Sequence, residues 1–136
     1  MMEKRPPRTL GGPHTTFWEY CTRGEFRLQR CGDCHGYLWP PSPVCDNCLS
    51  DNLSWEPVSG RGKIVSNCTF HRPYYRECEP PWDVILIELA EGPRFVSNPK
   101  DIPREGLREG AEVRVAFIAC EDKHGQFRLP VFEAAN

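Results

Sequence analysis

The sequence predicts a mainly β protein in which a short N-terminal helix and a four-cysteine zinc ribbon precede a small, five-stranded OB-fold barrel. Two Cys-x-x-Cys pairs stand ten residues apart between residues 31 and 48. The second half of the chain alternates short apolar runs with turn residues, at the spacing of a small antiparallel barrel. We therefore expect a flexible tail at 1–13, the helix and zinc ribbon at 14–52, and the OB-fold barrel at 53–136.

The helix is predicted to begin at Thr16, the first residue of a Thr-x-x-Glu capping box. Phe17, Tyr20 and Cys21 follow at the i, i+3 and i+4 spacing of one helical face. Gly24 is placed to end the helix after about two turns. This face is largely aromatic, so we expect the helix to dock with it on another part of the protein.

The metal site is predicted from Cys31, Cys34, Cys45 and Cys48, which an alternating strand over 26–30 leads into. Each Cys-x-x-Cys pair wraps a turn so that both thiolates point at one ion, and two such turns make a closed tetrahedral site. The segment has too few apolar residues to fold by itself, so the metal is expected to have a structural role.

The identity of the metal rests on context, because tetrahedral four-sulfur sites hold both zinc and iron. An iron electron carrier would not need the strand-rich second half, so zinc is favoured. Gly32 and Gly36 are expected to supply the positive φ that such turns use. His35 follows the second ligand, but four cysteines already fill the coordination sphere, so it is expected on the surface.

The other four cysteines, Cys21, Cys68, Cys78 and Cys120, are scattered, and we expect free thiols there. Cys68 and Cys120 lie in apolar strand patterns and are predicted to be core residues. A disulfide framework is the alternative for eight cysteines. The first thirteen residues lack the apolar run of a secretory signal, which favours a reduced, cytoplasmic protein. No run is long and apolar enough to cross a membrane.

The barrel strands are predicted from period-two or continuous apolar patterns separated by turns. A stretch at 98–110 is polar and turn-rich, with room for one helical turn. Gly60 and Gly62 precede a strand and not a helix, so they fit a bent barrel strand better than a phosphate-binding loop. The expected strands are 63–70, 83–89, 94–97, 112–119 and 127–132.

No catalytic motif is evident, since the sequence lacks both Gly-x-Ser-x-Gly and His-Glu-x-x-His. The chain is rich in aromatic residues, and OB barrels also use aromatics to stack single-stranded nucleic acid, which is the alternative function. A net charge of -2 argues against it, because proteins that bind phosphate backbones carry a basic excess. Trp18 and Trp39 are expected to join helix, ribbon and barrel, or to form an interface with a protein partner.

The order of these parts resembles the domain-of-unknown-function-35 family. The resemblance covers about residues 14–133 and is most specific in the cysteine spacing and the Glu-Leu-x-Glu-Gly-Pro-Arg stretch. The similar segments are Phe17-Trp18, the two cysteine pairs, Gly62–Val65, Pro80–Trp82, Ile87–Arg94 and Phe127–Phe132. The resemblance implies a rubredoxin-like zinc ribbon joined to an OB fold.

Members of this family associate with thiolase-superfamily enzymes that act on CoA thioesters, including the aldolases of steroid side-chain breakdown. The resemblance therefore implies an accessory subunit without catalytic residues, which helps to form the CoA-thioester channel and the complex of a thiolase or carbon-carbon lyase. CoA phosphates would need cations. Candidate contacts near predicted strand ends are Arg61, Lys63, Arg94 and Lys100.

Overall fold

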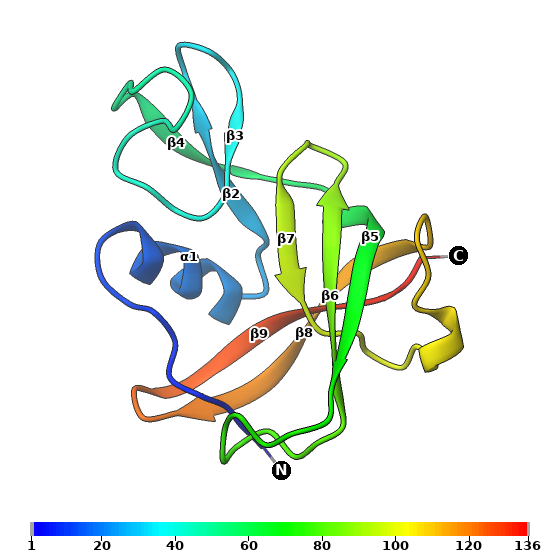
Figure 1. The fold of residues 1–136 in the computed structure, drawn as a ribbon. Helices are drawn as coiled ribbons and strands as arrows, with labels where there is room; N and C mark the ends of the chain where they lie inside the picture. The colour runs from blue at the N-terminus through cyan, green and yellow to red at the C-terminus, as the bar shows by residue number, and fades with distance from the viewer. Residues whose placement is uncertain (1, 136) are drawn as a thin grey trace.

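The computed structural model describes residues 2–135 and consists mostly of strands, with one α-helix lying beside two sheets (Figure 1). The smaller sheet has the order β3-β2-β4 and carries the ribbon, and the larger sheet has the order β1-β8-β5-β6-β7, with β9 paired to β8. Strands β5 to β9 are the five strands of the predicted barrel. The elements are β1 (Glu3–Lys4), α1 (Pro13–Thr22), β2 (Arg27–Cys31), β3 (Tyr37–Leu38), β4 (Leu53–Pro57), β5 (Arg61–Phe70), β6 (Trp82–Leu89), β7 (Arg94–Ser97), the 3₁₀ turn η1 (Arg104–Gly106), β8 (Glu112–Asp122) and β9 (Gly125–Ala134).

The helix begins three residues before the predicted start, so the capping box at Thr16 is wrong. Gly12 is the N-cap and Pro13 is the first helical residue. Proline suits this position because its φ is already helical and its missing N–H would have no partner there. Gly24 ends the helix as predicted, with a φ of 77° and its N–H donated to the Cys21 carbonyl at 2.9 Å.

The N-terminal segment, expected to be a flexible tail, lies along the barrel in the structure. Strand β1 pairs in parallel with β8. Arg8 donates to the Asp122 carboxylate from Nε (2.8 Å), Nη2 (3.2 Å) and its backbone N–H (3.0 Å). The guanidinium also lies 4.1 Å from the Phe127 ring centroid and 5.8 Å from that of Trp18. These contacts hold the segment against both the barrel and α1.

A glycine directly before β5 allows a neighbouring strand to approach closely, and the strand itself is irregular. A Cβ on Gly60 would stand 2.4 Å from a methyl of Val115. The register of β5 against β6 then shifts between Ile64 and Ser66, as in a β-bulge. The bulge changes which residues face the core, so Cys68 is exposed and its prediction as a core residue is wrong. Cys120 is buried, as predicted.

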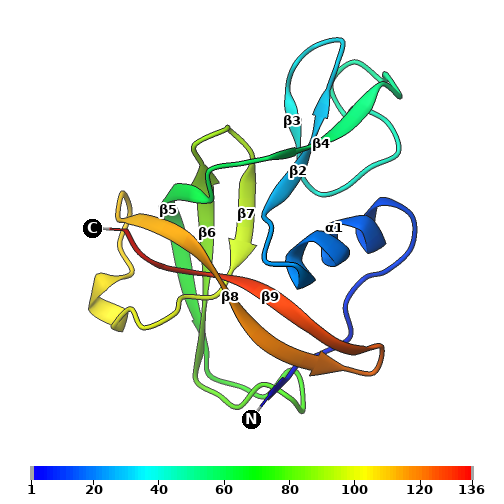
Figure 2. The same cartoon turned by 180° about the vertical axis from the view of Figure 1, so that it is seen from behind.

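One core joins the helix, the ribbon and the barrel. Trp39, which follows β3 of the ribbon, lies 4.6 Å from both Phe17 of α1 and Phe95 of β7, measured between ring centroids. Phe95 also contacts Phe132 of β9 at 6.0 Å. Both ribbon views show α1 beside β9 (Figures 1 and 2). The prediction that Trp39 joins the parts is therefore confirmed. No helix within residues 2–135 is long and apolar enough to span a membrane.

Candidate functional site

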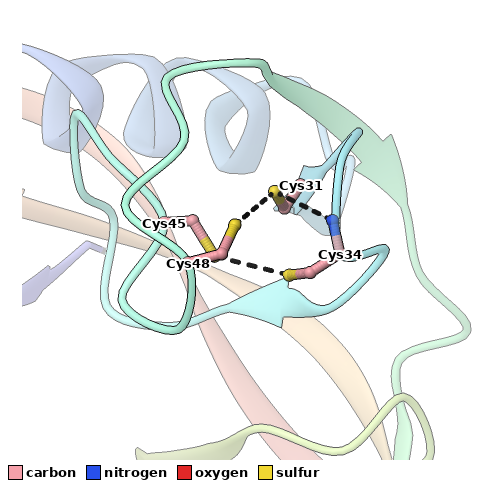
Figure 3. A group of neighbouring side chains, drawn as sticks. All are labelled: Cys31, Cys34, Cys45 and Cys48. Carbon is pink, nitrogen blue, oxygen red and sulfur yellow. Dashed lines mark hydrogen bonds between the residues drawn. The ribbon is translucent and has the colours of Figure 1, made fainter.

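The four predicted cysteines converge at the tip of the ribbon, as Figure 3 shows. Their sulfur atoms all lie within 4.8 Å of one another. The Sγ atoms of Cys31 and Cys48 are 3.5 Å apart, and those of Cys34 and Cys45 are 3.6 Å apart. A tetrahedral ion with metal–sulfur bonds of about 2.3 Å places its sulfurs about 3.8 Å apart. The arrangement therefore fits a four-thiolate metal ion.

The two cysteine pairs form nearly identical turns. The N–H of His35 donates to the Cys31 carbonyl at 2.9 Å, and the N–H of Leu49 donates to the Cys45 carbonyl at the same distance. Both donors have a positive φ, 66° at His35 and 62° at Leu49. In each turn, the residue after the second ligand therefore reverses the chain so that both sulfurs face the same point.

The glycines next to the ligands act differently from the prediction, because neither Gly32 nor Gly36 has a positive φ in the structure. Gly32 instead lies close to Asn52: a Cβ there would stand 2.5 Å from the side-chain nitrogen of Asn52 and 3.3 Å from its backbone oxygen. The Gly32 N–H donates to the Asn52 carbonyl at 2.8 Å. His35 is exposed, as predicted.

Backbone amides favour the thiolate form in the first pair. Hydrogen bonds from the backbone N–H groups of Cys34 and Asp33 lower the pKa of Cys31 to about 6. At Cys48, the amide of Ser50 favours the thiolate, but the neighbouring thiols outweigh it and raise the pKa of Cys48 to about 12. Four thiolates this close need a cation to balance their charge, which matches the donor set of a metal site.

Polar side chains that the sequence analysis missed hold the two turns together. Asp33, between the first two ligands, accepts hydrogen bonds from Ser50 and from Asn52, which lie beyond the last ligand. These bonds lower the pKa of the Asp33 carboxyl. The buried amide of Gln29 exchanges two 2.8 Å hydrogen bonds with the backbone of Ser42, in the loop between the pairs. No sequence motif predicts these hydrogen bonds, because the residues become neighbours only when the ribbon folds.

The four candidate CoA contacts do not form one cationic cluster. Arg61 and Lys63 lie together at the rim of a shallow cavity of about 400 Å³, with the carboxylates of Glu88 and Glu112 on the same rim. Lys63 of β5 lies directly opposite Glu88 of β6 on one side and opposite Glu112 of β8 on the other. The cavity therefore offers alternating charges.

The other two candidates lie outside that cavity. Arg94 begins β7, where its guanidinium is 3.8 Å from the Glu88 carboxylate. Lys100 lies in the connection after β7 and donates to Asp101 at 2.9 Å. Each of these cations therefore already has a carboxylate neighbour.

A second site, which the sequence did not predict, lies where α1, the ribbon and the barrel meet. It is a groove of about 300 Å³, which we call the aromatic groove. Its lining includes Trp18, Trp39, Tyr75, Trp82 and Phe95, together with Pro130 of β9. These residues come from parts of the chain that are far apart in the sequence, so only the folded protein brings them together.

Two families of domains match the chain. The ChsH2 rubredoxin-like zinc ribbon domain matches residues 18–54, and the ChsH2 C-terminal OB-fold domain matches residues 55–117. A DUF35 domain-containing scaffold protein of Pyrococcus furiosus is 30% identical, over 73% of this chain and 74% of that protein.

Two longer relatives have names that refer to CoA hydratases. A probable enoyl-CoA hydratase alpha subunit of Thermomonospora curvata is 30% identical over 95% of this chain. The 3-oxo-4,17-pregnadiene-20-carboxyl-CoA hydratase alpha subunit of Mycobacterium tuberculosis is 30% identical over 78% of this chain. The chain spans 40% of the first relative and 34% of the second.

Solved structures agree with this grouping. A chain of the Ltp2-ChsH2(DUF35) aldolase superposes with a TM-score of 0.81 and 28% identity, over 93% of this chain and 98% of that chain. A DUF35 protein of unknown function from Sulfolobus solfataricus superposes with a TM-score of 0.59 and 12% identity, over 77% of this chain and 78% of that chain, a likeness of fold.

Proposed function

This chain belongs to the DUF35 family, and from that membership we propose that it is a non-catalytic accessory subunit of a thiolase-superfamily enzyme that acts on CoA thioesters. The observation that carries the proposal is the likeness to the Ltp2-ChsH2(DUF35) aldolase, which extends over nearly the whole of both chains. The name of that assembly pairs a DUF35 chain with a second protein, and the enzyme would be that second protein.

The metal site supports a structural role. We propose that Cys31, Cys34, Cys45 and Cys48 hold one zinc ion, since their spacing fits the zinc–thiolate bond length. Four protein ligands leave no open position for a water or substrate, so the ion would stabilise the ribbon and not activate a nucleophile.

The aromatic groove supports a protein partner. Tyr75, with 53% of its surface exposed, and Val96, with 62%, both line it. Tyrosine and tryptophan are the residue types that concentrate at the energetic centres of protein interfaces. An accessory subunit needs such a surface, and a nucleic-acid binder would need a cationic one.

The CoA thioester would meet this subunit at the edge of the enzyme's channel. Arg61, Lys63, Arg94 and Lys100 stay as our candidate contacts for the CoA phosphates. Two carboxylates, those of Glu88 and Glu112, share the cavity with Arg61 and Lys63, so this rim alone has little excess positive charge. We therefore expect the enzyme subunit to complete the site for the CoA phosphates.

The test is to purify the tagged chain from its native cells, identify what accompanies it by mass spectrometry, and then co-express the pair. We expect a thiolase-superfamily protein in near-equal amount, one zinc per chain, and cleavage of CoA thioesters by the pair and not by this chain alone. An unrelated OB-fold protein that carries the same tag and goes through the same purification is the control. Recovery of only nucleic-acid-binding proteins, with salt-sensitive binding of oligonucleotides, would contradict the proposal.

A further inference from the structure

Strand β7 forms an open edge of the larger sheet. Within residues 2–135 it pairs with β6 alone, and the strand order ends there. The N–H of Leu89 donates to the Pro93 carbonyl at 2.9 Å, which fixes the register of the hairpin. In this register Phe95 and Ser97 exchange hydrogen bonds with β6, so the N–H and C=O of Val96 point away from β6.

Strand β9 closes onto the chain directly after β7, where Phe132 donates to the Asn98 carbonyl at 3.1 Å and Lys100 donates to the Phe132 carbonyl at 2.8 Å, but it forms no ladder with β7 itself among the described residues. Pro130 of β9 lies across from β7 and has no N–H to donate. The only direct bond here that involves β7 runs from the Ser97 hydroxyl to the Pro130 carbonyl, at 2.9 Å, among the described residues. The backbone groups of Val96 therefore remain available to a new strand.

The aromatic groove runs along the same edge. Its lining includes Phe95 and Ser97, which face the core, and also Val96, which faces outward. A groove that touches both faces of an edge strand is the space that an added strand would occupy. The side chains of such a strand would meet Trp39, Tyr75 and Leu129, which line the groove.

The charge of the groove narrows the kind of segment that fits. Arg5 is the one charged residue among the described residues that line it. Its Nη2 donates to the side-chain oxygen of Asn98, the residue directly after β7, at 3.0 Å. Its Nη1 lies 3.4 Å from the carboxylate of Glu3, which is half exposed. Arg5 is therefore already paired, and the adjoining cavity that it also lines carries the carboxylates of Glu3, Glu77, Glu79 and Asp83. The rest of the groove lining is uncharged, so the groove complements an apolar segment.

We propose that an extended, apolar segment of the enzyme subunit adds to the edge of β7 as a further strand. This inference rests on the proposed function, because the occupant is a segment of that enzyme. Backbone hydrogen bonds at Val96 would give the affinity, and the aromatic groove would give the specificity.

The first test compares Val96→Pro with Val96→Ala in binding to the co-purified thiolase-superfamily subunit. Proline removes the N–H that faces the open edge and leaves the bonds to β6 in place. We expect binding weakened by about tenfold or more for Val96→Pro and by about threefold or less for Val96→Ala. Equal zinc content and equal melting temperature of the two variants verify the fold. Equal affinities for the enzyme would overturn the inference.

The second test needs no variant. Hydrogen exchange of the Val96 amide is expected to be fast in the free protein and at least about tenfold slower in the complex. An amide that exchanges equally fast in both would overturn the inference.

The outcomes separate the two proposals. If the wild-type chain binds no thiolase-superfamily protein, the proposed function fails. If it binds one and Val96→Pro binds equally well, the accessory role stands and the strand addition fails. If Val96→Pro instead dissolves a dimer of this chain, the occupant is a second copy, and our choice of occupant is wrong.

Discussion

The Arg8–Asp122 ion pair gives the sharpest test of the N-terminal segment, which the sequence indicated as a tail. The side chain of Asp122 has 0% of its surface exposed and that of Arg8 10%. The carboxylate accepts three hydrogen bonds from Arg8 and one from the backbone N–H of His124. We predict that Asp122→Asn releases this segment from the barrel.

The loss of unfolding free energy in Asp122→Asn can be derived from the number of hydrogen bonds that the side chain still accepts. The single side-chain oxygen of asparagine accepts about two of the four hydrogen bonds, so at least two are lost. A hydrogen bond to a charged group contributes about 1.5 kcal/mol or more, which gives a loss of about 3 kcal/mol at pH 7. This agrees with the lower end of the about 3–5 kcal/mol seen when one partner of a buried pair is removed. The low end is expected because the Arg8 guanidinium keeps its contacts with two aromatic rings.

The effect should disappear in acid. Burial alone would raise the pKa of Asp122, but the bonds from Arg8 and His124 outweigh it and hold the pKa well below the ordinary value. A depressed folded-state pKa stabilises the protein above the unfolded pKa of about 3.9, and this stabilisation is lost as the pH falls toward the folded-state value. The difference between wild type and Asp122→Asn should therefore be full at pH 7 and shrink progressively below pH of about 4.

The assay is urea unfolding of both proteins at several pH values. Acid also protonates the cysteine ligands in both, so the quantity compared is the difference between them at each pH. The double variant Arg8→Met with Asp122→Asn should recover part of the stability, because it leaves no buried charge unpaired. A loss below about 1 kcal/mol at pH 7, or a difference that does not shrink in acid, would refute the buried ion pair.

Three further predictions concern the metal, the thiols and the shared core. Cys45→Ser should abolish binding of one zinc per chain and lower the melting temperature, whereas Cys68→Ser should do neither, as metal analysis and calorimetry would reveal. A thiol reagent at pH 8 should modify exposed Cys68 well before the buried thiols of Cys21 and Cys120. Burial raises the pKa of Cys21 to about 12 and that of Cys120 to about 11, so rapid labelling of either thiol would contradict this prediction. Phe95→Ala should cost about 3–5 kcal/mol of unfolding free energy, and separate unfolding of ribbon and barrel in the wild type would argue against the shared core.

The sequence predicted the four-cysteine cluster because the chemistry of such a site fixes the residue type and the spacing. Two thiolates separated by two residues can point at one ion whatever surrounds them, so the spacing of Cys31, Cys34, Cys45 and Cys48 was sufficient. The barrel strands followed equally well from their apolar patterns and turns. The cysteine spacing and the apolar patterns each lie within a short stretch of sequence, so these two predictions depend little on the rest of the fold.

The failures arose where tertiary structure overrides a local pattern. The period-two pattern placed Cys68 in the core, but the bulge after Ile64 shifted the alternation. Thr16 offered a capping box, yet the chain began the helix at Pro13. The role of Arg8 depends on Asp122, which is 114 residues away, and no pattern within a short window contains both.

The aromatic groove shows why the ribbon and the barrel have to be considered together. Its wall includes Trp39, which follows β3, and β3 is held in the small sheet by β2, whose last residue is the ligand Cys31. The opposite wall is Phe95 of β7, the strand with the open edge. The position of one wall would therefore depend on the proposed zinc ion, whereas the position of the other depends on the barrel. A structural ion that never meets substrate would in this way set the shape of the surface at which we place the enzyme partner.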